Sequence, residues 1–233
     1  MVLPSRGDVY VGEKFVEESS VWDHYSPDFM RPRPHGKFEI LDVDFVTLLP
    51  DHGYFHFLIE DLPALLAVVS KAKNLVSSKK IHLIVSSRQN RYFSDVIKFL
   101  DIPLIQTDTQ KWYRVKNLIM LSRGHDSGRA HPRDLQLIRN TFKQFLAKSS
   151  SRNIYISRMK SSRSPANEIL LIQELKYLGF EIIESEKMTI FDQITLFSET
   201  QILIGVHGAG LANMVFMPEN SKVIEVVDPN WAN

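Results

Sequence analysis

Short apolar runs alternate with amphipathic segments along most of this chain. Runs rich in Ile, Leu and Val predict buried strands at 81–86, 103–105, 117–121, 154–157, 181–184, 201–206 and 222–227. Segments with apolar residues at helical spacing predict helices at 92–100, 134–148, 167–178 and 189–197. The first fifty residues predict strands and loops whose pairing stays open. Strands and helices in alternation indicate a mostly parallel sheet, so the pattern predicts an α/β fold.

The C-terminal half has the most regular pattern. From residue 154 onward it follows a β-α-β-α-β-α-β order, which predicts a Rossmann-like half-domain with ligands beyond the carboxyl ends of its strands. The polar stretch 148–152 is the best linker candidate, so we expect domains at 1–148 and 149–233. The helix at 167–178 is expected to turn four apolar residues toward the core, namely Ile169, Ile172, Leu175 and Leu178.

A glycine-rich turn follows the strand at 201–206. Residues 207–210, His-Gly-Ala-Gly, lead into a segment whose helical spacing continues to Pro218. Glycines let the backbone approach a ligand, and the N–H groups at a helix start favour anions. His207 adds a donor or a titratable group near neutral pH. The turn predicts a site for a phosphate-bearing ligand, with the alternative that it binds nothing, as many such turns do.

A second polar loop follows the strand at 154–157. It contains Arg158, Lys160 and Arg163, and guanidinium groups bind phosphate oxygens through two parallel hydrogen bonds. Because this loop and the glycine turn both follow parallel strands, we expect them on the same edge of the sheet. Arginines and backbone N–H groups on one edge make phosphate-ligand binding the favoured interpretation of this half.

Residues 52–66 combine apolar side chains with titratable ones. His56 and Glu60 are four positions apart on one helical face, Asp61 follows, and Pro63 is expected to kink a helix or begin a new one. A carboxylate beside an imidazole predicts an acid/base pair. An ion pair without a chemical role has the same spacing and stays the alternative. The polar loop 122–132 also carries His and Arg, but solvated loops have the same composition.

Composition excludes several classes of function. The 233 residues carry Lys+Arg 28 against Asp+Glu 27, a net charge of +1, so no global field favours nucleic acid or an anionic membrane. With no cysteine, the chain has no disulfide, catalytic thiolate or cysteine zinc site. No signal peptide is recognisable and no run approaches the roughly 20 apolar residues of a membrane span, so we expect a cytoplasmic location.

Several motifs follow one another along residues 50–227. They are Tyr155-Ile156-Ser157-Arg158, Arg163, Asn167-Glu168, Phe191-Asp192-Gln193, residues 205–213, Phe216-Met217-Pro218 and Val223-Ile224-Glu225. Together with the upstream segment 54–63, which has aromatic residues, His56, Glu60 and Leu-Pro, this series resembles the glycosyltransferase family 61 domain. Bacterial members of that family are often described as capsular polysaccharide biosynthesis proteins. The ordered series is far more specific than any single motif.

The resemblance implies a GT-B-like architecture, in which two Rossmann-like halves with mostly parallel sheets face a cleft. It implies inverting transfer of a hexose, pentose or N-acetylhexosamine from a nucleotide-sugar to a hydroxyl acceptor, without a bound metal, in capsular or other surface polysaccharide biosynthesis. Glu225 is expected near the ribose or base of the nucleotide. The residues expected to bind the donor are Arg158, Arg163, Asn167, His207, Gly208, Ala209, Gly210, Leu211, Asn213 and Glu225.

An inverting transferase needs a base for the acceptor hydroxyl and positive groups for the departing diphosphate. Fixed arginines and a helix start would serve the second need. For the base we choose Glu60 in the N-terminal, acceptor-side domain, with His56 and Asp61 as reserves.

The expected partners are a nucleotide-sugar and a glycan or lipid-linked glycan acceptor, with no cofactor and no nucleic acid. Peripheral membrane association and the oligomeric state stay open. Family members continue past the Ile-Glu strand with a helical tail, and we expect that tail to be short or lost here. The alternative function is therefore a catalytically impaired nucleotide-sugar-binding protein of the same fold. A nicotinamide-dependent enzyme is disfavoured because its Gly-x-Gly-x-x-Gly fingerprint after a first strand is missing.

Overall fold

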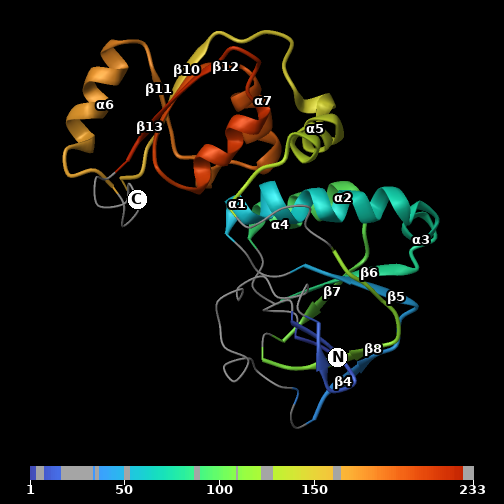
Figure 1. Cartoon of the computed structure of the whole chain (residues 1–233). Coiled ribbons are helices and arrows are strands. Elements are labelled where there is room, and N and C mark those ends of the chain that lie inside the picture. Colours follow the sequence, from blue (N-terminus) through green and yellow to red (C-terminus); the bar gives the residue numbers. More distant parts are fainter. Residues whose placement is uncertain are drawn as a thin grey trace. The chain divides into compact units, whose positions relative to one another are not determined.

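The computed structural model describes residues 1–3, 8–16, 34, 37–49, 53–86, 90–108, 110–121, 128–159 and 164–227. The chain divides into two compact units, Met1–His131 and Pro132–Asn233 (Figure 1). Each unit has its own parallel sheet and its own helices, so the predicted α/β class is confirmed.

The first unit contains short strands and a helical segment broken into several types of helix. Its strands are β1 (Val2–Leu3), β2 (Asp8–Val11), β3 (Lys14–Phe15), β4 (Glu39–Leu41), β5 (Phe45–Leu48), β6 (Ile81–Ser86), β7 (Leu104–Thr107), β8 (Tyr113–Val115) and β9 (Leu118–Ile119). Its helices are α1 (Tyr54–His56), the π-helix η3 (Phe57–Asp61), α2 (Leu62–Lys71), α3 (Lys73–Ser77) and α4 (Arg91–Leu100).

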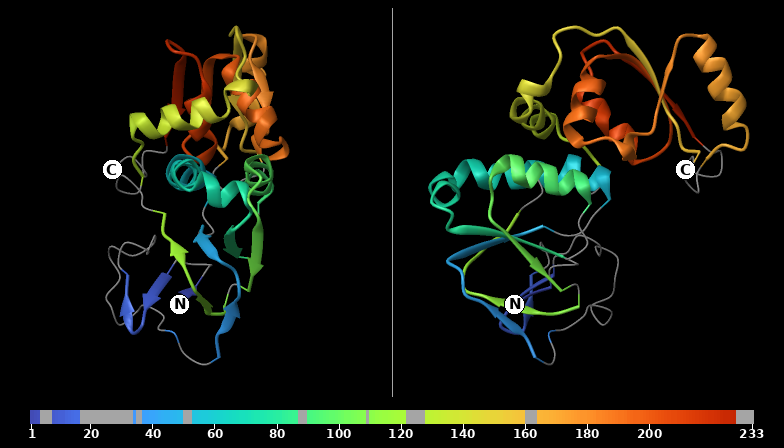
Figure 2. Two further views of the ribbon diagram at one scale, coloured as in Figure 1. Left: turned by 90° about the vertical axis from the view of Figure 1, so that its right-hand side faces the viewer. Right: turned by 180° about the vertical axis from the view of Figure 1, so that it is seen from behind.

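The strands of this unit form two sheets. One is parallel throughout, in the order β7-β6-β5-β9, as a Rossmann-like half requires. Helices α2 and α4 lie on one side of it (Figures 1 and 2). Its other side faces a second sheet in the order β3-β2-β1-β8-β4, where β4 and β8 are parallel and the other pairs antiparallel. A sheet thus takes the place of the second helical layer expected for this half.

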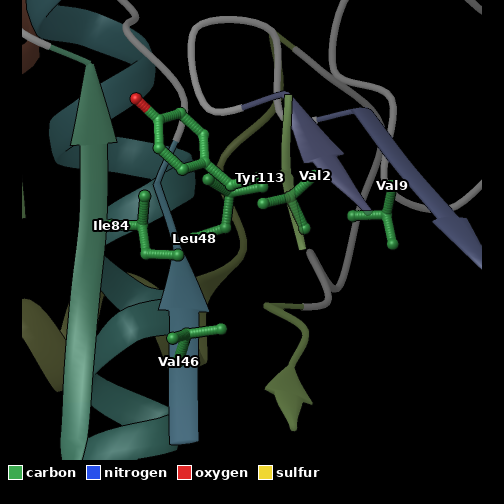
Figure 3. Packing of buried hydrophobic residues seen from close by; sticks show 6 residues of the cluster. All are labelled: Val2, Val9, Val46, Leu48, Ile84 and Tyr113. Atoms are coloured by element: carbon green, nitrogen blue, oxygen red, sulfur yellow. The ribbon is translucent and has the colours of Figure 1, made fainter. Parts of the chain in front are cut away.

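Buried apolar side chains join these two sheets. Those of β5 and β6 face those of β1, β2 and β8 (Figure 3). Each is at most 7% exposed, so the hydrophobic effect holds the layers together. The cluster comprises Val2, Val9, Val46, Leu48, Ile84 and Tyr113.

The second unit is a doubly wound α/β structure. Its elements are α5 (Pro132–Thr141), the 3₁₀ helix η4 (Lys143–Phe145), β10 (Arg152–Ile156), α6 (Glu168–Tyr177), β11 (Glu181–Ile183), the 3₁₀ helix η5 (Ser185–Lys187), α7 (Ile190–Ser198), β12 (Thr200–Val206), the 3₁₀ helix η6 (Ala209–Phe216) and β13 (Lys222–Val226). All strand pairs are parallel, in the order β11-β10-β12-β13. The Rossmann-like pattern predicted for this half is present.

Helices cover both faces of this sheet. Tyr155 on β10 donates a hydrogen bond to Glu168 of α6, so that face carries α6. A Cβ at Gly205 on β12 would lie 2.9 Å from Leu211 Cδ2, so the opposite face carries η6. Neighbouring strand residues point to opposite faces, and Tyr155 pairs with Ile204, one position before Gly205. The two contacts therefore lie on opposite sides of one sheet.

The boundary between the units lies earlier than the sequence predicted. Helix α5 belongs to the second unit, because Arg139 Nη1 donates to the carbonyl oxygens of Val215 at 2.6 Å and Met217 at 2.9 Å. The expected linker 148–152 is bound in place, since the N–H groups of Ser151 and Arg152 both donate to the Glu199 carbonyl. The division at 131/132 replaces the predicted 148/149 because these contacts hold 132–152 to the C-terminal sheet.

Helix α6 faces the sheet with a different set of residues than its apolar pattern predicts. Ile169 and Leu178, expected in the core, are 60% and 64% exposed, whereas Leu175 is buried as predicted. Glu168 is buried instead, because its carboxylate binds Tyr155 and the backbone of Arg158. Those hydrogen bonds turn the helix so that Ile169 points outward.

Local interactions define the ends of the helices further along the chain. Thr189 caps α7 by accepting from the Asp192 N–H at 3.1 Å and donates to the Asp192 carboxylate. Gly179 ends α6 with φ +82°, and η6 ends before Pro218. The segment after the glycine turn is a 3₁₀ helix rather than the expected α-helix. Within the described residues, none of the helices has the length and apolar character that a bilayer span requires.

Candidate functional site

The predicted phosphate site lies at the switch point of the second unit. Strands β10 and β12 are neighbours although β11 lies between them in sequence, so the connections from their carboxyl ends leave in opposite directions. Open α/β sheets bind ligands in the crevice at such a point. Arg158 follows β10 and His207 follows β12, so the structure brings the two predicted loops together.

Arg158 lies directly across the glycine turn. Its Nη1 donates to the carbonyl oxygen of His207 at 2.6 Å. A Cβ at Gly208 would overlap that nitrogen and lie 3.1 Å from Arg158 Cζ. Gly208 also has φ 156° and ψ 177°, a conformation that residues with a side chain rarely adopt. The turn therefore needs glycine here to let the guanidinium lie against the backbone.

His207 is paired with Glu225. Its Nδ1 lies 2.7 Å from Glu225 Oε1, and the side chains are 53% and 43% exposed. Glu225 reaches it because β13 pairs with β12, with Glu225 opposite Gly205. When a neutral imidazole donates through Nδ1, its Nε2 accepts; a protonated ring offers Nε2–H as a donor. Glu225, predicted near the nucleotide, thus orients His207 in this structure.

The other predicted residues of the turn shape it from within. Leu211 is buried, and Gly210 packs against Ile156. Asn213 is 0% exposed, and its Nδ2 donates to Gln193 Oε1 at 2.9 Å and to the Gly210 carbonyl at 3.2 Å. Ala209 is the first residue of η6 and is partly exposed. Leu211 and Asn213 therefore position the turn and do not face solvent.

The predicted arginine loop is described at its two ends. Arg163, expected to bind the donor, lies outside the described residues, as does Lys160. Asn167 is exposed just before α6 and makes no side-chain capping bond. Arg158 is thus the member of this loop that the structure places against the glycine turn.

Two residues outside the predicted set support this site. Arg139 on α5 binds the last carbonyls of η6, and Gln193 on α7 binds Asn213. Gln193 belongs to the motif Phe191-Asp192-Gln193, but neither spacing nor composition indicates that Gln193 or Arg139 reaches the glycine turn.

A third, Glu168, does have a signal. It lies 2% exposed, on the helix face that otherwise carries apolar residues. Burial raises the pKa of its carboxyl group, but hydrogen bonds from Ser164, the Arg158 N–H, Tyr155 and Ser157 outweigh burial and lower that pKa below its ordinary value. An acidic residue in the first turn of a helix beside the arginine loop is the feature that could have identified it.

The candidate base Glu60 lies in the π-helix of the first unit. Pro63 has no N–H and its ring would clash with a carbonyl one α-helical turn earlier. The chain widens there, and the Leu62 N–H donates to the Phe57 carbonyl five residues back. The sequence predicted that Pro63 kinks a helix or begins a new one; in the structure α2 begins at Leu62, with Pro63 in its first turn, and a π-turn precedes it.

Glu60 is 1% exposed and held from two sides. Its Oε1 accepts from the Gly128 backbone N–H at 2.7 Å and lies 3.1 Å from His56 Nδ1. The predicted His56–Glu60 pair is therefore formed, with the imidazole partly exposed. Asp61 is also buried, at 3% exposure.

This pair lies at a switch point of its own sheet. Strands β5 and β9 are neighbours in the first unit, although β6, β7 and β8 lie between them in sequence. The segment with Glu60 follows β5, and Gly128 follows β9. The loop 122–132, predicted to be ordinary solvated chain, thus contributes Gly128; its residues 122–127 lie outside the described residues.

The part of the chain that the structure describes contains no group of three or more His, Cys, Asp or Glu side chains placed to hold a metal ion. The sequence contains one Asp-x-Asp pair, Asp42 and Asp44. These residues precede β5 and so lie at its amino end, away from the carboxyl edge that carries Glu60. In the second unit, the groups that can bind phosphate oxygens are the Arg158 guanidinium, the His207 ring and the N–H groups of the glycine turn.

A doubly wound parallel sheet with an arginine and a glycine turn at its switch point places the second unit among α/β proteins that bind ligands at strand ends. The chain belongs to the Glycosyltransferase 61 family, because that family's model matches residues 54–224, well over half of the chain. The resemblance noted from its motifs is confirmed.

Curated relatives are similar to part of this chain. One is the alpha-1,3-arabinosyltransferase XAT2 of Oryza sativa subsp. japonica, 31% identical over 87 residues, which are 35% of this chain and 14% of the relative. Another is the EGF domain-specific O-linked N-acetylglucosamine transferase of Drosophila melanogaster, 34% identical over 83 residues, 33% of this chain and 16% of the relative. The chain thus matches less than a fifth of the length of either.

Proposed function

We propose that this protein is a glycosyltransferase that moves a sugar from a nucleotide-sugar donor to a hydroxyl acceptor. The observation that carries the proposal is the Arg158 guanidinium lying across Gly208 at the switch point of the second unit. A departing diphosphate is stabilised by a fixed cation together with backbone N–H donors. Membership of the Glycosyltransferase 61 family supports this reaction class.

In this proposal the donor diphosphate binds to Arg158, His207 and the backbone of 208–210. Glu225 acts through His207 by fixing the orientation of the ring. Leu211 and Asn213 keep the turn in shape from the interior. Arg163 and Asn167 stay predicted donor contacts.

Glu60 is the proposed base, with His56 and Asp61 as reserves. Its buried carboxylate beside an imidazole, tied to Gly128 at the switch point of the first unit, supports the choice. The acceptor oxygen attacks the anomeric carbon while its proton passes to Glu60. The bond from that carbon to the diphosphate breaks, and its electron pair leaves with the diphosphate. Attack opposite the leaving group inverts the anomeric centre.

The finer parts of the proposal come from the family resemblance. They are a GT-B-like arrangement, metal-independent chemistry, a glycan or lipid-linked glycan acceptor, and a role in capsular or other surface polysaccharide biosynthesis. The cytoplasmic location stays a prediction from the sequence, and peripheral membrane association stays open. The names of the relatives add two donor sugars to test first, arabinose and N-acetylglucosamine.

The test combines donor binding with turnover. Thermal shift with UDP, GDP and CMP, followed by transfer and hydrolysis assays with the corresponding nucleotide-sugars, is expected to reveal stabilisation by a nucleoside diphosphate and turnover of its sugar. Arg158→Ala should weaken diphosphate binding at least about tenfold, because it removes a charge-assisted contact. Lys176→Ala on α6 is the matched control, since it removes the same charge from an exposed position.

Each outcome favours one function. Stabilisation by a diphosphate without turnover of any nucleotide-sugar supports the alternative, a catalytically impaired nucleotide-sugar-binding protein. Equal diphosphate affinity in Arg158→Ala and Lys176→Ala contradicts the proposed donor site. No stabilisation by any nucleotide contradicts both functions.

A further inference from the structure

We propose that Glu168 is a positioning residue that fixes Arg158 for diphosphate binding and so sets the donor affinity of the second unit. The proposal rests on the proposed function in one respect, that the ligand of Arg158 is a diphosphate.

The Glu168 carboxylate joins both ends of the loop that carries Arg158. Its Oε1 accepts from the Arg158 backbone N–H at 2.6 Å, and its Oε2 accepts from Ser164 Oγ at 2.6 Å. Arg158 and Ser164 are described residues that precede and follow the segment 160–163 in the chain. One carboxylate therefore binds both of them.

Arg158 is consequently held at two points. Glu168 fixes its backbone, and the His207 carbonyl accepts from its guanidinium at 2.6 Å. A long side chain loses rotamer freedom when it is fixed in this way, and a ligand that then binds it has less entropy to overcome. Without the hydrogen bond from the Arg158 N–H to Glu168, a ligand that binds Arg158 would have to overcome this loss of entropy itself.

Packing alone does not explain an acid at position 168. The helix face toward the sheet otherwise carries apolar side chains, and a buried carboxylate is costly unless hydrogen bonds satisfy it. Glu168 receives such bonds from Tyr155 at 3.0 Å, from Arg158, from Ser164 and from Ser157. Arg158 and Ser164 belong to the loop at the site, which is why we assign the residue to the site.

The test compares two variants that disturb the same carboxylate. Glu168→Gln removes the charge and one of the two acceptor oxygens, so the side chain no longer accepts from both the Arg158 N–H and Ser164 Oγ, and its remaining neutral oxygen is a weaker acceptor. Tyr155→Phe removes one hydroxyl partner and leaves the charge-assisted bond to Arg158. Calorimetric titration with UDP and GDP is expected to give an affinity at least about tenfold lower in Glu168→Gln and within about twofold of wild type in Tyr155→Phe. Amide hydrogen exchange at Arg158 should be faster in Glu168→Gln and unchanged in Tyr155→Phe.

The exchange measurement separates this inference from the proposed function. If the wild type binds no nucleoside diphosphate, the donor assignment fails, and faster exchange at Arg158 in Glu168→Gln still supports the positioning role. Unchanged exchange overturns the inference, and so does an unchanged diphosphate affinity in a protein that binds UDP or GDP. If Glu168→Gln does not fold, Ser164→Ala replaces it, because it removes the second tether from a more exposed position and should also accelerate exchange at Arg158.

Discussion

At the scale of single residues, Gly208 links sequence to site most directly. Its backbone conformation suits glycine, and the space that a side chain would occupy holds the Arg158 guanidinium. The two constraints are independent, because one concerns the backbone angle φ of Gly208 and the other the position of the Arg158 side chain. Gly210, two residues on, has neither: a Cβ there would meet its nearest atoms at 3.6 Å, an ordinary contact.

Gly208→Ala should therefore displace Arg158 as well as strain the turn. We expect a loss of about 1–3 kcal/mol in the free energy of unfolding and at least about tenfold weaker binding of nucleoside diphosphates. Urea unfolding and titration with UDP measure the two effects. Gly210→Ala is the control and should change both little; equal effects of the two substitutions would contradict the role given to Gly208.

Glu168 gives a prediction about pH. Its pKa is lower in the folded protein than the ordinary 4.5, so the unfolded chain binds more protons in that range. The stability that this group contributes is fully present above pH 4.5 and is lost as the pH falls through the folded pKa. We expect the free energy of unfolding of the wild type to fall more steeply below pH 4.5 than that of Glu168→Gln. Parallel pH profiles in urea unfolding would refute this.

At the scale of elements, the sequence predicted those features that depend only on residues close to one another in the chain. The strands β6 and β12 were predicted because the period and length of an apolar run are encoded within a few residues. The exposed face of α6 was mispredicted because one buried carboxylate, Glu168, outweighed the apolar repeat. A helix start at Pro63 was one of the two predicted alternatives, but the sequence does not specify the π-turn that precedes it.

Pairing between distant segments could not be predicted at all. Strand β1 pairs with β8, more than a hundred residues later in the chain, and no local pattern specifies that partner. The same limit applies to the candidate site: contacts from distant elements could not be predicted. Arg158, His207 and Gly208 were predicted to share an edge because strand ends do so in a parallel sheet. Arg139 and Gln193 were missed because they reach the turn from other elements.

Helix α5 gives a prediction about the extent of the second unit. Phe142 is fully buried after α5, with its ring centroid 6.3 Å from that of Phe216, and Arg139 binds the end of η6. A fragment of residues 132–233 should unfold cooperatively, whereas 149–233 lacks these contacts and should not. Circular dichroism during heating of both fragments tests this. Cooperative unfolding of the shorter fragment would restore the boundary at 148/149.

At the scale of the whole molecule, each unit carries its candidate residues at the switch point of its own parallel sheet. Arg158 and the glycine turn lie between β10 and β12, and Glu60 is tied to the loop after β9 from the segment after β5. The sites have complementary chemistry, cationic and hydrogen-bond donating in one and carboxylate-based in the other. Donor binding and proton removal are therefore assigned to separate units, and a substitution in one should leave the other's task intact.

Glu60→Gln tests that separation. The amide keeps the shape of the side chain and an oxygen for the Gly128 N–H, but it does not take up the acceptor proton. We expect transfer to fall by about 10²–10⁴-fold, the range for loss of a general base, while titration with UDP or GDP gives the wild-type affinity. Asp61→Asn, the neighbouring buried carboxylate, is the matched control and should lower stability while transfer continues. Loss of transfer in Asp61→Asn alone would move the base to that reserve, and wild-type turnover in Glu60→Gln would remove Glu60 from the mechanism.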